Sequence, residues 1–362
     1  MTLIPGSSRK KNFAEFREVL KGNKQPDRVH LIELWIDEEM IKAVYRLLGN
    51  TQWRTDRESM ALQRLTVMGH LGYDLCNAGS AYLNLPVFTE GTAKNTAILS
   101  EADSLRHWAE EGHGIIRSWA DFHAVDWESI IPDPDFLTPY KKHLPEGMKL
   151  AVGATMFEFV LERWMGYEGL FTSIYENPEL VDAVFRRVGD IVFDFYKYYV
   201  SDEDVGVVFH ADDLGFKTSL MISPKLIRKY VISWTERLAE MVHRAGKVLI
   251  FHSCGRVEPI LPDLIAAGVD GFHSFQDLIM PIAAFKHRYP DIAALGGVDV
   301  DALARMDESS LRKYVRRILD DVASEGKFAL GSGNTVTNYM PVENYLAMID
   351  EAHKYTFSGS GR

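Results

Sequence analysis

Two residues of the stretch "KVLIFHSCGRVEPI" (247–260) could bind a metal ion, because His252 and Cys254 end an apolar run of strand length. Side chains two positions apart on an extended strand point to the same face. Imidazole nitrogen and thiolate sulfur both suit Zn²⁺, and a catalytic zinc has three protein ligands and one open position. The spacing alone favours a simpler interpretation, in which the histidine is hydrogen-bonded and the cysteine packs as a small hydrophobe.

The composition is that of a globular protein with a large core, because 46% of the 362 residues are hydrophobic. The net charge of −11 argues against a nucleic-acid-binding face. Two cysteines, Cys76 and Cys254, are too few for a disulfide framework and fit a reducing compartment. The sequence shows neither an apolar run of about 20 residues nor a signal peptide, so we expect a cytoplasmic protein that does not span a membrane.

Short β-branched, apolar runs alternate with longer segments of helical period, which is typical of parallel βα units. Eight such runs, each leading toward a helix, predict a single-domain (β/α)8 TIM barrel of the α/β class. The predicted strands are 28–35, 72–79, 148–155, 205–213, 247–253, 269–275, 292–299 and 327–333.

Three segments do not fit the repeat. Residues 1–27 are expected to be an N-terminal extension, whose first 16 residues would form a solvated, frayed end. Residues 357–362 are expected to be a C-terminal tail, and 28–356 the barrel. Residues 80–147 are expected to be an insertion after the second strand, covering the barrel mouth.

The active site of a TIM barrel lies at the carboxyl ends of its strands. We therefore expect substrate to be bound by polar and aromatic groups at those ends, and proton transfer to involve acidic groups and a histidine there. Polar residues at strand ends also serve structural roles, so each assignment is a separate hypothesis. The expected substrate-binding residues are Glu33, Trp35, Asn77, His273, Gln276 and Asn334, and the expected catalytic residues are Glu158, His210 and Asp212.

From about residue 205 to 355, the order of motifs resembles the uroporphyrinogen decarboxylase superfamily. These (β/α)8 barrels include uroporphyrinogen decarboxylases and the zinc-dependent methyltransferases of methanogens and acetogens. The matching stretches are "ADDLGFKTSLMISPKLIRKYV", "HSCGRVEPILPDLIAAGVDGFHSF", "LGGVDVDAL" and "GSGNTVTNYMPVENYLAMIDEAHKY".

The resemblance favours the methyltransferase-like branch. The decarboxylases carry an Arg-Gln-Ala-Gly element that recognises substrate carboxylates, and this chain lacks it; Glu33 and Asp37 lie in the corresponding region. The methyltransferases carry a His-x-Cys motif, which His252 and Cys254 match, and a later cysteine that completes the zinc site. Asn334 stands at the position of that later cysteine.

A metal in this chain would thus need another ligand. We expect Glu158 to be that ligand, with His210, Asp212 and Cys76 as alternatives.

The resemblance implies Zn²⁺ and a corrinoid carried by a partner protein. The favoured function is transfer of a methyl group from a small methylated substrate, methoxyaromatic or similar, to that corrinoid protein, with zinc as a Lewis acid. Activation of an acceptor thiol by zinc is the other methyltransferase mechanism that the family implies. A uroporphyrinogen decarboxylase or related metal-free decarboxylase is the alternative enzyme, and a non-catalytic ligand-binding barrel is the third candidate. A homodimer stays open.

Overall fold

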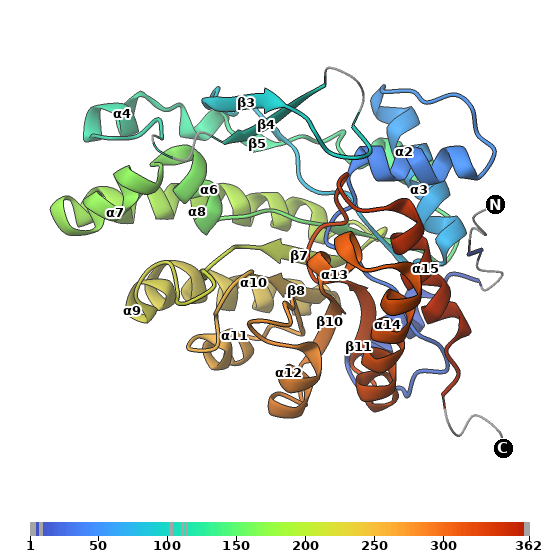
Figure 1. Ribbon diagram of the computed structural model, residues 1–362. Coiled ribbons are helices and arrows are strands. Elements are labelled where there is room, and N and C mark those ends of the chain that lie inside the picture. The colour runs from blue at the N-terminus through green and yellow to red at the C-terminus, as the bar shows by residue number, and fades with distance from the viewer. Residues whose placement is uncertain (1–4, 7–9, 101–103, 110–111, 113, 358–362) are drawn as a thin grey trace.

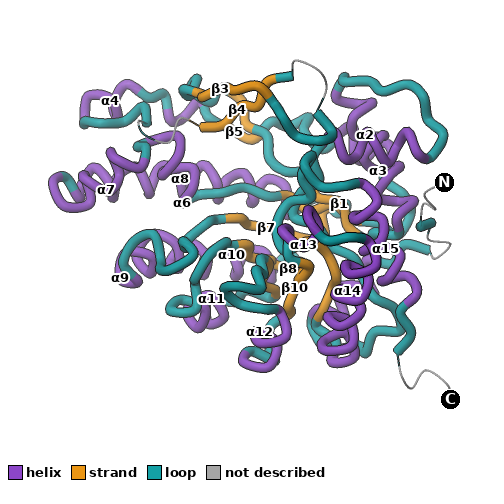
Figure 2. Tube along the Cα trace, viewed as in Figure 1, coloured by secondary structure: helices purple, strands orange, loops and turns teal. Residues whose placement is uncertain are grey.

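The computed structural model describes residues 5–6, 10–100, 104–109, 112 and 114–357. Its centre is a curled parallel sheet of seven strands whose order in space follows their order in the chain (Figures 1 and 2). The strands are β1 (Leu75–Asn77), β6 (Lys149–Val152), β7 (Val205–Ala211), β8 (Val248–His252), β9 (Gly271–His273), β10 (Ala293–Val298) and β11 (Phe328–Ser332). Each lies within a predicted strand, which confirms the parallel α/β architecture.

The first predicted strand, 28–35, is not a regular strand. It forms an isolated parallel bridge between Leu31 and Leu330 of β11. On its other side, the side-chain amide of Asn77 at the end of β1 donates to the Leu34 carbonyl at 2.7 Å. The segment therefore contacts both edge strands of the sheet, in the place that an eighth barrel strand would take.

Glu33 explains why this segment does not extend its ladder with β11. The backbone N–H of Ser332 would donate to the backbone of a regular parallel neighbour. It donates instead to the Glu33 carboxylate, at 3.1 Å, and the Ser332 hydroxyl donates to the same group at 2.5 Å. A side chain thus takes the place of a ladder hydrogen bond.

The inside of the curled sheet is filled by alternate residues of its strands, as the two-residue period of a strand requires. Helix α1 (Phe13–Leu20) adds Phe13, Phe16 and Leu20 to this inner cluster, and all three are buried. The Phe13 N–H donates to Gly147, which lies just before β6, so α1 sits at the amino ends of the strands. The expectation of a solvated, frayed N-terminus is wrong for this part of the extension, because its apolar face belongs to the core.

Helices cover the outer face of the sheet (Figure 1). The helical segment after β7 begins at α9 (Pro224–Ile227), where the Ser223 hydroxyl accepts from the Leu226 N–H and Pro224 occupies the first turn. A π-helical turn at Arg228–Ile232 interrupts it. The larger helices are α2 (Glu38–Leu47), α3 (Arg57–Leu71), α7 (Tyr167–Glu176), α8 (Pro178–Val200), α10 (Ser233–Arg244), α14 (Glu308–Val322) and α15 (Val342–Lys354). The shorter ones are α6 (Phe157–Phe159), α9 (Pro224–Ile227), α11 (Leu261–Ala266), α12 (Ile282–Arg288) and α13 (Val300–Arg305).

The segment 80–147 contains short elements outside the main sheet. Its Leu99 N–H donates to Asn338 in the loop after β11, at 3.0 Å, which brings it to the carboxyl-end side of that strand. Covering of the mouth by this segment stays a prediction. The elements are β2 (Tyr82–Leu83), β3 (Glu90–Lys94), β4 (Leu105–Ala109), α4 (Trp119–Ala124), β5 (Ile131–Pro132) and α5 (Thr138–His143).

Of the predicted tail, residues 358–362 lie outside the described residues. In the part of the chain that the structure describes, no helix combines the length and the hydropathy needed to cross a bilayer.

Candidate metal centre

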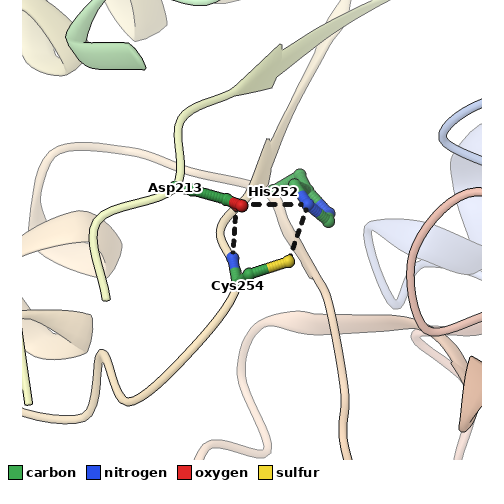
Figure 3. A group of neighbouring side chains, drawn as sticks. All are labelled: Asp213, His252 and Cys254. Atoms are coloured by element: carbon green, nitrogen blue, oxygen red, sulfur yellow. Dashed lines mark hydrogen bonds and ion pairs between the residues drawn. The ribbon is translucent and has the colours of Figure 1, made fainter. Parts of the chain in front are cut away.

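Asp213, His252 and Cys254 meet at the carboxyl ends of two neighbouring strands (Figure 3). His252 is the last residue of β8, Cys254 follows two positions later, and Asp213 follows β7. Their potential ligand atoms all lie within 4.8 Å of one another. His252 Nε2 is 3.5 Å from both the Asp213 carboxylate and the Cys254 sulfur, while the Cys254 N–H donates to Asp213 at 2.7 Å.

The strand period places the histidine of this group on the inner side of the sheet. Val248 and Ile250 of β8 belong to the inner cluster, so His252, in the same alternation, faces the inside at the strand's carboxyl end. His273 occupies the equivalent position on β9, beside it in register. Adjacent parallel strands thereby bring two histidines together at the inner edge of the mouth.

His273 orients His252. The two Nδ1 atoms are 2.7 Å apart. Burial, together with the charge of His252, holds the pKa of His273 well below its ordinary value, so its ring is neutral. If His252 Nδ1 carries the shared hydrogen, His252 Nε2 is free to face Asp213 and Cys254 as a metal ligand. His273 was predicted to bind substrate, whereas this contact fits a residue that positions a ligand.

Asn334 lies beside the cysteine, as the resemblance implied. Its side-chain amide is 2.9 Å from the Cys254 sulfur, and the Ser274 hydroxyl donates to that sulfur at 3.5 Å. Burial and the negative charge of Asp213 raise the pKa of Cys254 well above its usual value. In the absence of a cation the sulfur therefore stays a thiol, and a bound metal would have to displace its proton.

Glu158, expected to be the third metal ligand, lies outside the three-residue group but within its electrostatic reach. Burial, followed by the charges of Asp213 and Asp212, raises the pKa of Glu158 to about 9. Asp213 behaves oppositely: burial acts to raise its pKa, but the hydrogen bond and charge of His252 outweigh this and hold it below its usual value. One carboxyl is thus protonated at neutral pH, and the other is ionised next to the histidine.

Asp212 and His210 form a separate, buried network. Asp212 accepts from His210 Nε2 at 2.9 Å and from the Met156 N–H at 2.8 Å. It also accepts from the Glu158 N–H at 3.2 Å. His210 Nδ1 is 3.1 Å from the hydroxyl of Tyr196 on α8. These contacts connect the end of β7 to the loop after β6 and to an outer helix. Asp212 and His210, which were predicted to be catalytic, therefore have structural contacts.

Three residues that were predicted to bind substrate, in the first two predicted strands, contact the backbone or other side chains instead. Glu33, besides binding Ser332, accepts from the Tyr73 hydroxyl at 3.3 Å. Asn77 accepts from the Gly79 N–H at 2.9 Å in addition to its contact with Leu34. The Trp35 ring lies under the Arg64 guanidinium, 4.0 Å from the ring centre.

Cys76, an alternative metal ligand, is fully buried in the hydrophobic cluster on the outer side of β1, because Leu75 takes the inner side. Burial raises the pKa of Cys76 to about 11. Its thiol therefore faces away from the mouth.

A cavity of about 830 Å³ adjoins the candidate metal centre, and Asp213 and Cys254 are part of its wall. Gln276, predicted to bind substrate, also lines it. Asp299 shapes one side by accepting the Asp277 and Asp301 N–H groups, at 2.9 and 2.8 Å. Apolar walls come from loops after β7, β9 and β10, through Phe216, Met221, Leu278, Ile279, Val300 and Met306.

Sequence reasoning missed two parts of this site. Asp213 was not among the expected metal ligands, although it closely follows β7 and precedes the loop that faces Cys254. The apolar walls come from loop residues without a periodic pattern. The aromatic residues at strand ends do not supply these walls: Phe157, Phe209, Phe272 and Phe275 are buried in the core.

Comparisons with known proteins agree with this architecture. A methyltransferase from Methanosarcina mazei superposes with a TM-score of 0.67 at 17% sequence identity, covering 95% of this chain and 98% of that chain. A B12-independent methionine synthase from Shewanella sp. W3-18-1, in complex with selenomethionine, superposes with a TM-score of 0.52 at 12% identity, covering 91% of this chain and 95% of that chain. These likenesses show the fold.

A search among curated proteins found no match. The sequence model of the family described as uroporphyrinogen decarboxylase (URO-D) matches residues 141–355, more than half of the chain, including both strands that carry the metal centre. The chain therefore belongs to the uroporphyrinogen decarboxylase family.

Proposed function

We propose that this protein is a zinc-dependent methyltransferase of the uroporphyrinogen decarboxylase family. It would transfer a methyl group from a small methylated substrate, methoxyaromatic or similar, to a corrinoid carried by a partner protein. The observation that carries the proposal is the convergence of Asp213, His252 and Cys254 at one wall of a partly apolar cavity.

The side chains present fit a catalytic zinc. Nitrogen, sulfur and carboxylate oxygen are all established zinc ligands, and three protein ligands leave one coordination position for substrate. Asp213 and Cys254 line the cavity, so a ligand entering it meets the metal centre directly. His273 supplies the hydrogen bond to the second ring nitrogen that metal-bound histidines usually have. Asp213 replaces Glu158 as the expected third ligand.

When bound, zinc would supply a Lewis acid that polarises the heteroatom carrying the methyl group. Asp213 and His252 would hold this ion, with Cys254 as the ligand that loses a proton. A set with one sulfur and one carboxylate is less electron-rich than one with two thiolates, which favours Lewis-acid chemistry over activation of a bound thiol.

Glu158 can supply the proton that demethylation of an ether needs. Loss of the methyl group leaves an alkoxide or phenolate, and protonation of that oxygen gives a neutral alcohol or phenol. In the metal-free protein, burial and the charges of Asp213 and Asp212 raise the pKa of Glu158 to about 9, so Glu158 carries a proton at neutral pH. Glu158 is not part of the cavity wall, so a substrate would have to approach it on the side of Asp213. The cavity's apolar walls exclude water from an aromatic ring and leave the methylated group near the ionised Asp213.

The two structural likenesses support the proposal without determining the substrate. Both superposed proteins are described by methyl-group chemistry, one as a methyltransferase and one as a methionine synthase. At 17% and 12% sequence identity, the substrates of these two proteins cannot be assigned to this chain.

The proposal is tested by the metal content of the purified protein. We expect about one zinc per wild-type chain and its loss in Cys254→Ala. Cys76→Ala is the matched control, because it removes the other thiol from the far side of β1 and should keep the metal. Absence of zinc from wild type reconstituted with excess zinc, or retention of zinc in Cys254→Ala, would refute the proposal.

Methyl transfer itself is tested by following methylation of a free corrinoid, kept in the Co(I) state by a chemical reductant, by methoxyaromatic compounds, with the zinc-loaded protein and with Cys254→Ala. The decarboxylase alternative predicts loss of carboxylates from uroporphyrinogen instead. That alternative is disfavoured by the charges at the cavity, where the four carboxyl groups of Asp213, Asp277, Asp299 and Asp301 outnumber the cations of Lys217 and Arg305 and would repel a substrate with many carboxylates.

A further inference from the structure

Ser274, which follows β9, is one of three non-glycine residues with a positive φ angle in the part of the chain that the structure describes. Asn84 and Lys327 have φ angles of 59° and 48°, near the left-handed region that ordinary residues can visit. Ser274 has a φ of 103°, outside that region. A serine in such a conformation is strained, and retained strain of this kind is concentrated at functional sites.

The positive φ of Ser274 reverses the side-chain alternation at the end of β9. His273 faces the inner side, so a regular strand would turn Ser274 outward and Phe275 inward. Phe275 instead packs on the outer side, where its ring centre is 5.9 Å from that of Phe272 and 5.0 Å from that of Phe285 on α12. The Ser274 hydroxyl donates to the Cys254 sulfur at 3.5 Å. The strained residue thus directs its side chain to the candidate metal centre.

The neighbouring strand shows that this backbone angle does not call for a serine. Gly296 and Gly297 of β10 have φ angles of 90° and 101°. Glycine adopts such angles readily because it has no Cβ. Ser274 has a side chain at a similar angle, so its hydroxyl is the feature that the strain serves.

Two hydrogen-bond donors meet at the Cys254 sulfur, which Figure 3 shows beside His252. The Asn334 amide lies at 2.9 Å and the Ser274 hydroxyl at 3.5 Å. Hydrogen bonds to a charged acceptor are about twice as strong as those to a neutral one. Both contacts are therefore strongest when the sulfur is a thiolate, the form that binds a metal. Stabilising a thiolate also makes it a weaker nucleophile.

A nucleophilic thiolate is a hazard in this position, because Cys254 lines the cavity in which a methylated substrate would bind. Attack of the sulfur on the methyl carbon would form an S–CH3 bond, break the C–O bond and leave the electron pair on the departing oxygen. That oxygen would take a proton from Glu158, as in the proposed reaction. The product at position 254 would be a neutral thioether, which is not among the usual ligands of zinc. A single event would therefore inactivate the chain.

We propose that Ser274, together with Asn334, protects the Cys254 thiolate from methylation by the substrate. Ser274 is a positioning residue, since it acts through the sulfur. The proposal rests on the proposed zinc-dependent methyltransferase function, and it identifies a side reaction that this function has to avoid.

The test is the rate at which methyl iodide methylates Cys254 in the full chain with zinc bound. The sulfur displaces iodide, and mass spectrometry of the tryptic peptide 248–256 locates the added methyl group. Ser274→Ala should keep its zinc and react about five- to tenfold faster than wild type, because the sulfur has lost a hydrogen bond. Ser233→Ala, at an exposed serine of α10, is the matched control and should react at the wild-type rate.

A spectroscopic measurement separates the hydrogen bond from a change of access. With Co²⁺ in place of zinc, a hydrogen bond stabilises the sulfur lone pairs and raises the energy of the sulfur-to-metal charge-transfer band. The band should move to lower energy in Ser274→Ala and stay in place in Ser233→Ala. Wider access to the sulfur alone would not move it.

A second variant separates the hydroxyl from the backbone. Ser274→Gly also lacks the hydroxyl but relieves the strain. Its Cys254 should be methylated as fast as that of Ser274→Ala, while its urea midpoint of unfolding should lie above that of Ser274→Ala.

With zinc bound, a wild-type methylation rate in Ser274→Ala or Ser274→Gly would overturn the proposal, and so would an unmoved charge-transfer band. The zinc content of each sample is measured before methylation. A wild type that binds no zinc would refute the proposed function itself, and the protective role with it.

Discussion

The Nδ1 atoms of His252 and His273 lie 2.7 Å apart, so one hydrogen joins the two imidazoles. Because burial keeps His273 neutral, its ring can accept this hydrogen and hold His252 in the tautomer that leaves Nε2 unprotonated. His273→Ala should therefore weaken zinc binding about 10- to 100-fold, measured by competition with a chelator. His287→Ala, at an exposed histidine of α12, is the control. An unchanged zinc affinity in His273→Ala would show that the neighbouring ring does not orient the ligand.

Adding a second thiolate at position 334 tests the arrangement of the metal ligands. The amide of Asn334 is 2.9 Å from the Cys254 sulfur, so a cysteine at this position would bring a second thiolate to the metal centre. We expect Asn334→Cys to bind zinc about tenfold more tightly or better, because soft thiolates favour zinc. Asn334→Ala should stay within a few-fold of wild type. Both are measured by the same chelator competition, and weaker binding in Asn334→Cys would contradict the arrangement of the ligands.

The adjacent carboxylates Asp212 and Asp213 should respond differently to removal. Asp212→Ala leaves two backbone N–H groups without acceptors, those of Met156 and Glu158, and should lower the free energy of unfolding by about 2 to 4 kcal/mol. Asp213→Ala should lose zinc and, because it leaves one backbone N–H without an acceptor, that of Cys254, should lower the free energy of unfolding by only about 1 kcal/mol. Urea denaturation and metal content separate the two outcomes, and retention of zinc in Asp213→Ala would argue against a ligand role for Asp213.

Glu158 predicts an alkaline limit to activity. In the metal-free protein, burial and the charges of Asp213 and Asp212 raise its pKa to about 9, so the acid form is present at neutral pH and is lost as the pH rises. Zinc bound to Asp213 would cancel part of this shift, so the turnover rate of wild type should fall at or below about pH 9. Glu158→Gln should lose about 100-fold or more in rate and no longer show this limit. A wild-type profile flat to pH 10 would exclude Glu158 as the proton donor.

Glu33 predicts a pH-dependent stability unrelated to catalysis. Burial raises its pKa to about 8, against 4.5 in an exposed carboxyl. The folded protein keeps the proton that the unfolded chain releases, so this contribution is complete below pH 4.5 and is lost as the pH rises to about 8. The free energy of unfolding should fall by about 1 kcal/mol per pH unit in this window. Glu33→Gln should reduce the slope in urea titrations between pH 5 and 8 by about 1 kcal/mol per pH unit, with Glu258→Gln as the comparison. The part that comes from Glu158, whose pKa is raised to about 9, should remain.

The strand pattern predicted most of the fold because parallel strands buried on both faces give continuous apolar runs. The segment 28–35 shows where a pattern is insufficient: its apolar residues are buried as expected, but Glu33 takes the Ser332 N–H that a ladder would use. Such an exchange depends on a contact between residues far apart in the chain. The same limit explains the N-terminal extension, whose helix is amphipathic but whose partner is the end of the sheet.

The part of the candidate site that depends on local spacing in the sequence was predictable. His252 and Cys254 lie together because the strand period requires it, and the resemblance placed Asn334 beside them. The choice between Asp212 and Asp213 could not be read from adjacent positions of one sequence. It depends on the direction that each side chain takes after β7, toward the Met156 N–H for Asp212 and toward Cys254 for Asp213.

Helix α1 bears on the order in which the proposed substrate and the proposed partner protein would bind. Phe13, Phe16 and Leu20 fill the inside of the sheet at the amino ends of its strands, so the metal centre is approached from the opposite side. Under the proposed function, a small methylated substrate and a macromolecular methyl acceptor would share one entrance. The small molecule would have to enter before the larger partner covers that entrance, and its demethylated product would have to wait until the partner leaves. A compulsory order of binding would then follow from three apolar side chains far from the chemistry.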